Sequence, residues 1–113
     1  MSEFDPTGRC SSDPGAKLDA GKIPVMRGAI YQFPRALETV AQLSDFGARK
    51  YTWNGWESVP DGVQRYRDAR GRHEFALAKG ETHDPDSKVH HLTAVAWNAL
   101  AELELMLRNE AQP

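Results

Sequence analysis

The chain has 113 residues, the length of one domain with a small core. Its 14 basic and 16 acidic side chains give a formal net charge of −2, which argues against a protein held to nucleic acid by a broad basic surface. No apolar run reaches the length of a membrane span, and the single cysteine, Cys10, cannot form an internal disulfide. We therefore expect a soluble cytoplasmic protein that binds neither membranes nor DNA directly.

The N-terminal segment differs in composition from the rest of the chain. Residues 1–15 are rich in Ser, Asp, Pro and Gly, and this composition is typical of a disordered arm. The folded domain is therefore expected over residues 16–113. Inside that domain, residues 22–32 fit either a loop or a short strand.

The first predicted helix begins at Pro34, because proline suits the first turn of a helix, and ends near Gly47. Apolar residues behind Pro34 recur at helical spacing, and Glu38 lies on the neighbouring face. The following loop, residues 52–60, carries two tryptophans in a short polar stretch.

The second predicted helix runs from a cap at Asp61 to about Gly80, which suits the position just past a helix end. A tight turn is predicted over residues 84–87, whose sequence is Asp-Pro-Asp-Ser. Either Asp86 or Ser87 could cap the helix that follows the turn.

The third predicted helix, residues 88–109, is the clearest element of the sequence. A continuous apolar stripe at helical spacing supports it. The stripe consists of Val89, Leu92, Ala96, Leu100, Leu103 and Leu107. His91, Asn98 and Glu102 share the edge of this stripe. Because no useful run alternates with period two, the chain is predicted to be all-α.

Candidate chemistry gathers around the turn between the second and third helices. Glu81 and Asp84, three residues apart at a helix exit, could converge on Mg²⁺, which prefers oxygen ligands; they could equally form a solvated acidic turn. His73 and His91 could be metal ligands, or histidines satisfied in the core. Glu38 is either a third oxygen ligand or a surface charge.

The remaining candidates are substrate contacts, each with an ordinary structural alternative. Lysines could bind phosphate or be solvated cations, and Asn98 could join two helices by hydrogen bonds. Trp53 and Trp56 could stack on a base or cover a neighbouring subunit. The phosphate candidates are Lys17, Lys22, Arg49 and Lys50.

Five short motifs in a fixed order resemble the phage and bacterial dATP/dGTP diphosphohydrolase family, over about residues 15–108. The first is Gly-Ala-Lys-x-Asp-x-Gly-Lys at residues 15–22, and the second is Phe-Gly-Ala-Arg-Lys-Tyr at 46–51 behind Glu38. The others are Arg-His at 72–73, Gly-Glu-x-x-Asp-Pro-x-Ser at 80–87, and His-Leu with Ala-Trp-Asn-Ala-Leu in residues 91–100.

The resemblance implies a fold and an activity. The family is similar to the MazG-like all-α NTP pyrophosphatases, including the phage MazZ-type enzymes, whose four-helix core is completed by dimers or tetramers. It implies a homo-oligomer that uses Mg²⁺, with Mn²⁺ as an alternative, to convert a purine deoxynucleoside triphosphate (dGTP or dATP) to dNMP and pyrophosphate. One branch of the family makes dGMP in phages that replace adenine with 2-aminoadenine, so a host cytoplasmic location in phage nucleotide metabolism follows.

The same resemblance implies roles for individual residues. Glu38, Glu81 and Asp84 become the expected metal ligands, with His73 and His91 as further catalytic residues. The expected substrate-binding residues are Lys17, Lys22, Lys50, Trp53, Trp56 and Asn98.

The chain also departs from its relatives. Alanines stand at positions 41 and 94, where MazG-like enzymes have a second glutamate and members of this family often have a second histidine. Glu74, Asp86 or Glu102 could complete the metal set. The alternatives to an enzyme are a catalytically silent nucleotide-binding or replication-associated helical module, and a purely structural oligomerisation unit.

Overall fold

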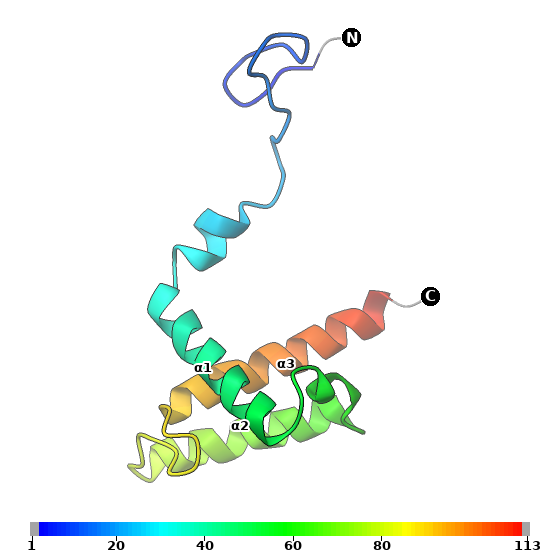
Figure 1. Ribbon diagram of the computed structural model, residues 1–113. Helices are drawn as coiled ribbons and strands as arrows, with labels where there is room; N and C mark the ends of the chain where they lie inside the picture. Colours follow the sequence, from blue (N-terminus) through cyan, green and yellow to red (C-terminus); the bar gives the residue numbers. More distant parts are fainter. Residues whose placement is uncertain (1–2, 112–113) are drawn as a thin grey trace. The chain divides into compact units, whose positions relative to one another are not determined.

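The computed structural model describes residues 3–111, and this part of the chain is helical with no strand (Figure 1). The prediction of an all-α chain is confirmed. The elements are a π-helix η1 (Met26–Ile30), α1 (Pro34–Lys50), a 3₁₀ turn η2 (Gly55–Ser58), α2 (Gly62–Ala78) and α3 (His91–Ala111). No helix in residues 3–111 has the length and apolar character needed to cross a membrane. The chain divides into two compact units, Met1–Phe33 and Pro34–Pro113.

The N-terminal unit is organised by one carboxylate. Asp5 Oδ1 accepts hydrogen bonds from the backbone N–H groups of Thr7 (3.0 Å) and Arg9 (2.8 Å), and Asp5 Oδ2 accepts one from that of Lys17 (3.1 Å).

Further along, Met26–Ile30 forms a π-helix, so the expected loop or strand over residues 22–32 was wrong there. The disordered arm expected over residues 1–15 stays a prediction.

Helix α1 begins at Pro34 as predicted, but it continues past Gly47 to Lys50. An ion pair between Asp45 and Arg49, 3.1 Å apart and one turn away from each other, supports this last turn. A glycine inside a helix costs only about 1 kcal/mol relative to alanine, and α1 continues through Gly47 at that cost. The expected helix end at Gly47 was therefore wrong by one turn.

Helix α2 starts at Gly62 without the side-chain cap expected from Asp61. Asp61 has φ 54°, in the left-handed region, whereas a capping side chain needs an extended backbone to reach the N–H groups of the first turn. Gly62 is buried, and a Cβ atom there would lie 2.9 Å from Leu105 Cδ1. Glycine at this position thus allows the start of α2 to approach α3 closely.

Polar side chains hold α2 against α3. Glu102 on α3 accepts hydrogen bonds from Arg67 Nε (2.8 Å) and Arg70 Nη2 (3.0 Å) on α2, and its side chain is only 11% exposed. These two hydrogen bonds lower the pKa of Glu102. The carboxylate is therefore a structural link between the helices, and it is already committed to two guanidinium groups.

The buried face of α3 is small and polar. It consists of His91, Thr93, Ala94, Asn98, Ala101 and Glu102. The leucines of the predicted apolar stripe are instead exposed in the single chain: Leu92, Leu100, Leu103 and Leu107 have exposed fractions of 58%, 49%, 52% and 50%. Small residues such as Ala94 and Ala101 let α2 pack closely, and about half of the surface of each of these leucines stays exposed in this unit.

Replacing Glu102 with glutamine should destabilise the helical unit by about 1–3 kcal/mol at pH 7, because two charge-assisted hydrogen bonds are weakened. Urea unfolding measures the change, with Glu110→Gln, an exposed position on the same helix, as the control. The contribution of a carboxylate with a lowered pKa is present above its ordinary pKa and is lost in acid. The gap between wild type and Glu102→Gln should therefore close as the pH falls; a gap independent of pH would contradict the ion pair.

Candidate metal centre and adjoining groove

The end of α2 places Glu81. Gly80 adopts φ 94°, as expected for the residue just past a helix end. Its N–H donates to Leu77 O (2.9 Å), and the N–H of Glu81 donates to Ala76 O (3.0 Å). This pair of bonds is a Schellman motif, which satisfies the last carbonyls of the helix. It turns the chain sharply and sets the direction of the Glu81 side chain.

A short hairpin-like turn connects Glu81 to α3 and positions Asp84. The N–H of Asp84 donates to Val89 O, and the N–H of His91 donates to Thr82 O, at 2.9 and 2.8 Å. Lys88 closes the turn with φ 70°, a left-handed conformation that a helix cannot include. For this reason α3 begins at His91 and not at Lys88 as predicted.

The cap of α3 also differs from the prediction. His90 Nδ1 accepts a hydrogen bond from the backbone N–H of Leu92 (2.9 Å), one of the free donors of the first turn. Ser87 Oγ instead accepts a longer bond (3.4 Å) from Val89, inside the turn. Asp86 lies in the same turn, so neither of the two residues proposed as the cap performs that role.

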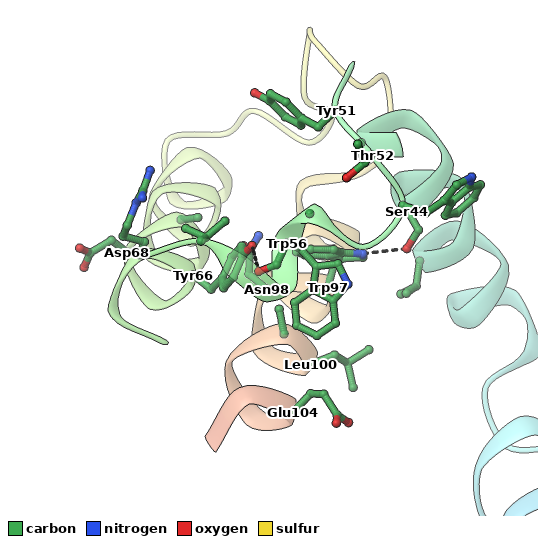
Figure 2. A pocket seen from close by; sticks show the side chains of 18 of the residues that line it. Ser44, Tyr51, Thr52, Trp56, Tyr66, Asp68, Trp97, Asn98, Leu100 and Glu104 are labelled. Carbon is green, nitrogen blue, oxygen red and sulfur yellow. Dashed lines mark hydrogen bonds between the residues drawn. The ribbon is translucent and has the colours of Figure 1, made fainter. Parts of the chain in front are cut away.

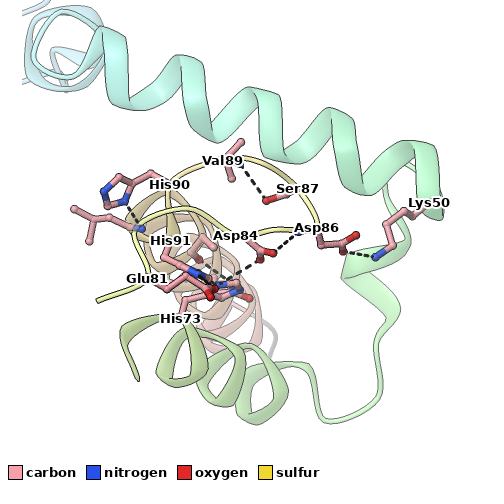
Figure 3. Close-up of polar contacts among 12 residues, drawn as sticks. Lys50, His73, Glu81, Asp84, Asp86, Ser87, Val89, His90 and His91 are labelled. Atoms are coloured by element: carbon pink, nitrogen blue, oxygen red, sulfur yellow. Dashed lines mark hydrogen bonds and ion pairs between the residues drawn. The ribbon is translucent and has the colours of Figure 1, made fainter. Parts of the chain in front are cut away.

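Two histidines and an aspartate meet between the helices (Figure 3). His73 Nδ1 on α2 lies 2.9 Å from His91 Nδ1 on α3, and Asp84 Oδ2 lies 3.8 Å from His73 Nδ1. One donor atom of each residue falls within 4.8 Å of the other two. The side chain of His91 is buried, whereas those of His73 and Asp84 are 23% and 21% exposed. This triad is a candidate metal site that opens to solvent on one side.

Glu81 orients one histidine of the triad. Its Oε1 lies 2.7 Å from His91 Nε2, and because a carboxylate accepts hydrogen bonds, the ring proton of His91 belongs on Nε2. The lone pair of His91 Nδ1 then faces His73. A histidine that donates to a carboxylate through one nitrogen while it presents the other is a frequent arrangement in metal sites.

The environment of His73 favours the neutral ring. Burial lowers its pKa most, the carboxylate of Asp84 raises it, and the electrostatic effects of His91 and Arg72 lower it further. A neutral imidazole is the form that binds a metal.

Lys50 reaches the same turn from the end of α1. Its Nζ lies 3.1 Å from Asp86 Oδ2, and the backbone N–H of Asp86 donates to Asp84 Oδ1 (2.8 Å). The hydrogen bond and charge of Asp86 raise the pKa of Lys50, so the ammonium is retained. Lys50 is one of the lysines expected to bind phosphate. Its partner Asp86 is two positions along the chain from Asp84 of the triad and is hydrogen-bonded to it.

Other expected site residues are not part of the triad. Glu38 is exposed on α1, Glu74 is exposed on α2, and Glu102 is paired with two arginines. Lys17 and Lys22 belong to the N-terminal unit. Their expected roles, and the metal role of Glu38, stay predictions.

A groove of about 1230 Å³ is lined by residues of α1, of the loop 51–59, of α2 and of α3. Trp56, Tyr66 and Trp97 line it and contact one another edge to face, with ring centres 5.7–6.3 Å apart. Figure 2 shows that the polar atoms of two of the rings are hydrogen-bonded: Tyr66 Oη donates to Trp56 O, and Trp97 Nε1 donates to Ser44 Oγ, both at 2.8 Å. These three rings therefore form a rigid apolar wall.

Trp53 and Trp56, the two tryptophans expected to bind substrate, differ in how exposed their rings are. Trp56 is half-buried in the wall, and the Arg108 guanidinium lies over its ring at 5.4 Å. Trp53 also lines the groove but is 62% exposed. Of the pair, Trp53 has the ring that is more open to a ligand.

Asn98 and Arg72 connect the groove with the triad. Asn98 lines the groove and is buried, two turns along α3 from His91, which is about 10 Å of helix. Its Nδ2 donates to Ala94 O, one turn back on α3 (2.7 Å). Arg72 lines the groove and directly precedes His73, and no carboxylate in residues 3–111 pairs with it. The groove and the triad are therefore built from the same two helices, α2 and α3.

Sequence reasoning did not identify Tyr66, Trp97 or Arg72 as part of a binding surface. One signal was present: α2 carries Tyr66, α3 carries Trp97, and the polar loop between α1 and α2 carries two more large aromatic rings. Aromatic side chains in elements that pack together often meet in one cluster.

A family model for the dATP/dGTP diphosphohydrolase N-terminal domain matches residues 12–112. The chain belongs to this family. The family assignment made from the five motifs is thereby confirmed.

One relative is a dATP/dGTP diphosphohydrolase of Salmonella phage PMBT28, which is 33% identical over 82 residues. The match covers 73% of this chain and 26% of that protein, so this member of the dATP/dGTP diphosphohydrolase N-terminal family spans about a quarter of its relative's length. No solved structure matches the chain significantly.

The pKa of His73 should be lower than that of an ordinary histidine in metal-free protein, and Asp84→Asn should lower it further, because Asp84 favours the charged ring. NMR titration of the ring C–H signals measures both. A lowered histidine pKa makes the fold less stable as the pH drops below about 6.5. An increase of the His73 pKa in Asp84→Asn would contradict the described contact.

Proposed function

We propose that this chain is a metal-dependent (d)NTP pyrophosphohydrolase that cleaves a purine deoxynucleoside triphosphate, dGTP or dATP, to dNMP and pyrophosphate. The observation that carries the proposal is a His–Asp–His triad and an aromatic groove that both use side chains of α2 and α3, in a member of the dATP/dGTP diphosphohydrolase N-terminal family. The phage relative, a dATP/dGTP diphosphohydrolase, supports the same substrates.

The triad supplies donors that suit a divalent cation. His73 and His91 offer imidazole nitrogens, and Asp84 offers a carboxylate oxygen; Glu81 and Glu38 are the further carboxylates that we propose for the centre. A bound Mg²⁺ or Mn²⁺ would neutralise phosphate charge and activate water. The partial exposure of His73 and Asp84 leaves one side open for the phosphates.

The basic residues would hold the phosphate chain. Lys50 retains its proton beside Asp86, and a phosphate group could exchange places with that exposed carboxylate, because a surface ion pair contributes little. We propose that Arg72, at the junction of groove and triad, assists Lys50. Lys17 and Lys22 from the N-terminal unit are proposed as further phosphate contacts.

The base would lie in the groove. The distance of about 10 Å along α3 between His91 and Asn98 suits a ligand with its phosphates at the triad and its base against the aromatic wall. We propose that Trp53 stacks on the base, that Trp56 forms the wall behind it, and that Asn98 contacts the nucleoside. A role in phage nucleotide metabolism, including the 2-aminoadenine pathway, is proposed from the family alone.

Pyrophosphate release should be seen with dGTP or dATP and Mn²⁺ or Mg²⁺, and the Glu81→Ala/Asp84→Ala double variant should lose at least about 100-fold in rate. A coupled pyrophosphate assay across the four dNTPs measures this. Glu110→Ala, an exposed carboxylate near the end of α3 and outside the triad, is the control. Full activity of the double variant would disprove the assigned site, and no release by wild type would disprove the activity.

The exposed face of α3 supports a further part of the proposal, assembly into a homo-oligomer. Leu92, Leu103, Met106 and Leu107 leave a long apolar strip uncovered in a chain of this size, and exposed apolar patches of this kind mark protein contacts. We propose that copies of the chain pack through this strip as a dimer or tetramer, as the MazG-like resemblance implies.

Wild type should sediment as a dimer or tetramer at micromolar concentration, and Leu103→Lys/Leu107→Lys should shift it toward monomer, because two charges would be buried in the interface. Analytical ultracentrifugation measures the masses, with Glu110→Lys as the control. A monomeric wild type would contradict the proposed assembly.

A silent nucleotide-binding module is the second candidate function. The buried Ala94, 2% exposed, offers no metal ligand where relatives often carry a histidine. In that case dGTP would raise the melting temperature, since a ligand at 100 times its Kd adds about 2.7 kcal/mol, while the pyrophosphate assay would stay negative.

A further inference from the structure

We infer that the His73–Asp84–His91 triad selects a six-coordinate first-row transition metal, such as Mn²⁺ or Co²⁺, over Mg²⁺. The catalytic use of that metal rests on the proposed function, whereas the selection rests on the geometry and chemistry of the three ligands. The inference also gives Glu81 a different role from the expected one. Glu81 orients the ligand His91 and does not itself have to bind the metal.

The spacing of the two histidines is compatible with octahedral coordination. Two ligands about 2.1 Å from a metal are about 3.0 Å apart at the right angle of an octahedron, and about 3.4 Å apart at a tetrahedral angle. His73 Nδ1 and His91 Nδ1 are 2.9 Å apart, which fits the octahedral arrangement. The same distance in the metal-free protein suits a hydrogen bond that a metal would replace.

The third ligand needs only a small adjustment. Asp84 Oδ2 is 3.8 Å from His73 Nδ1, so it has to move about 0.8 Å to reach the separation of about 3.0 Å between neighbouring octahedral ligands. The other oxygen, Oδ1, accepts the backbone N–H of Asp86 at 2.8 Å. That bond holds the carboxylate with Oδ2 directed to the histidines, as Figure 3 shows.

The ligand types then decide the metal. Imidazole nitrogens suit first-row transition metals, whereas Mg²⁺ takes oxygen ligands almost exclusively. Two histidines and one carboxylate on one side of an ion leave three positions open, the pattern of facial two-histidine, one-carboxylate centres. The exposed side of His73 and Asp84 gives water or phosphate oxygens access to these positions.

Glu81 prepares the site before any metal arrives. Its bond of 2.7 Å to His91 Nε2 fixes the ring and leaves Nδ1 as the free lone pair. Because its own side chain is 54% exposed and that of His91 is only 5% exposed, Glu81 can be changed with less risk to folding than the histidine. Loss of such an orienting partner typically lowers metal affinity by about 10–100-fold.

The test is metal binding by the full chain after treatment with a chelator and without nucleotide. Calorimetric titrations with Mn²⁺, Co²⁺ and Mg²⁺ should show Mn²⁺ and Co²⁺ binding at least about 10-fold tighter than Mg²⁺. The Co²⁺ complex should have the weak visible absorption of six-coordinate cobalt. Equal affinity for Mg²⁺, or the intense absorption of tetrahedral cobalt, would overturn the inference.

Variants assign the binding to the triad. His73→Asn should abolish Co²⁺ binding, and Glu81→Gln should weaken it by about 10–100-fold. His83→Asn, a histidine of the same turn that lies outside the triad, should bind as wild type does. Circular dichroism of each variant checks that it folds. Equal losses in His73→Asn and His83→Asn, or unchanged binding by Glu81→Gln, would overturn the assignment.

The outcome is separate from that of the pyrophosphate assay. Selective Co²⁺ binding without pyrophosphate release would support the triad and disprove the proposed activity. Pyrophosphate release that depends on Mg²⁺ and persists in His73→Asn would support the activity and overturn the inference.

Discussion

The packing of α2 against α3 through polar side chains is the contact on which the rest of the helical unit depends. Glu102 binds Arg67 and Arg70 at one level, and His73 meets His91 at another. Both contacts need the two backbones close together. Gly62 at the start of α2 and the small side chains on the buried face of α3 provide that closeness. The candidate site is therefore built into the helix interface.

This arrangement explains why the apolar residues of α3 face outward. The side of α3 that packs on α2 is occupied by polar and small residues, so the leucine strip is left on the other side. The apolar side of such a helix is exposed in the single chain, and an exposed apolar surface is where another chain could bind. The site and the proposed assembly surface thus lie on different sides of α3, because polar and small residues occupy one side and leucines the other.

Much of the candidate site could be predicted because local chemistry determines it. Gly80 ends a helix because glycine readily adopts the left-handed backbone there, and His91 shares a helical edge with Asn98. Other features depend on contacts between elements that spacing alone does not reveal. The left-handed backbone at Asp61 and Lys88 removed the expected cap and delayed the start of α3. The contact of Glu81 with His91 depends on how the turn between α2 and α3 folds, which the spacing of residues in the sequence does not reveal.

The most direct measurement is a crystal structure of the chain with Mn²⁺ and a non-hydrolysable dGTP analogue, with the metal located by its anomalous scattering. The account predicts a manganese peak about 2.1–2.3 Å from His73 Nδ1, His91 Nδ1 and an oxygen of Asp84, with the base against the wall formed by Trp56, Tyr66 and Trp97. Manganese bound elsewhere, with both histidines still hydrogen-bonded to each other, would contradict it.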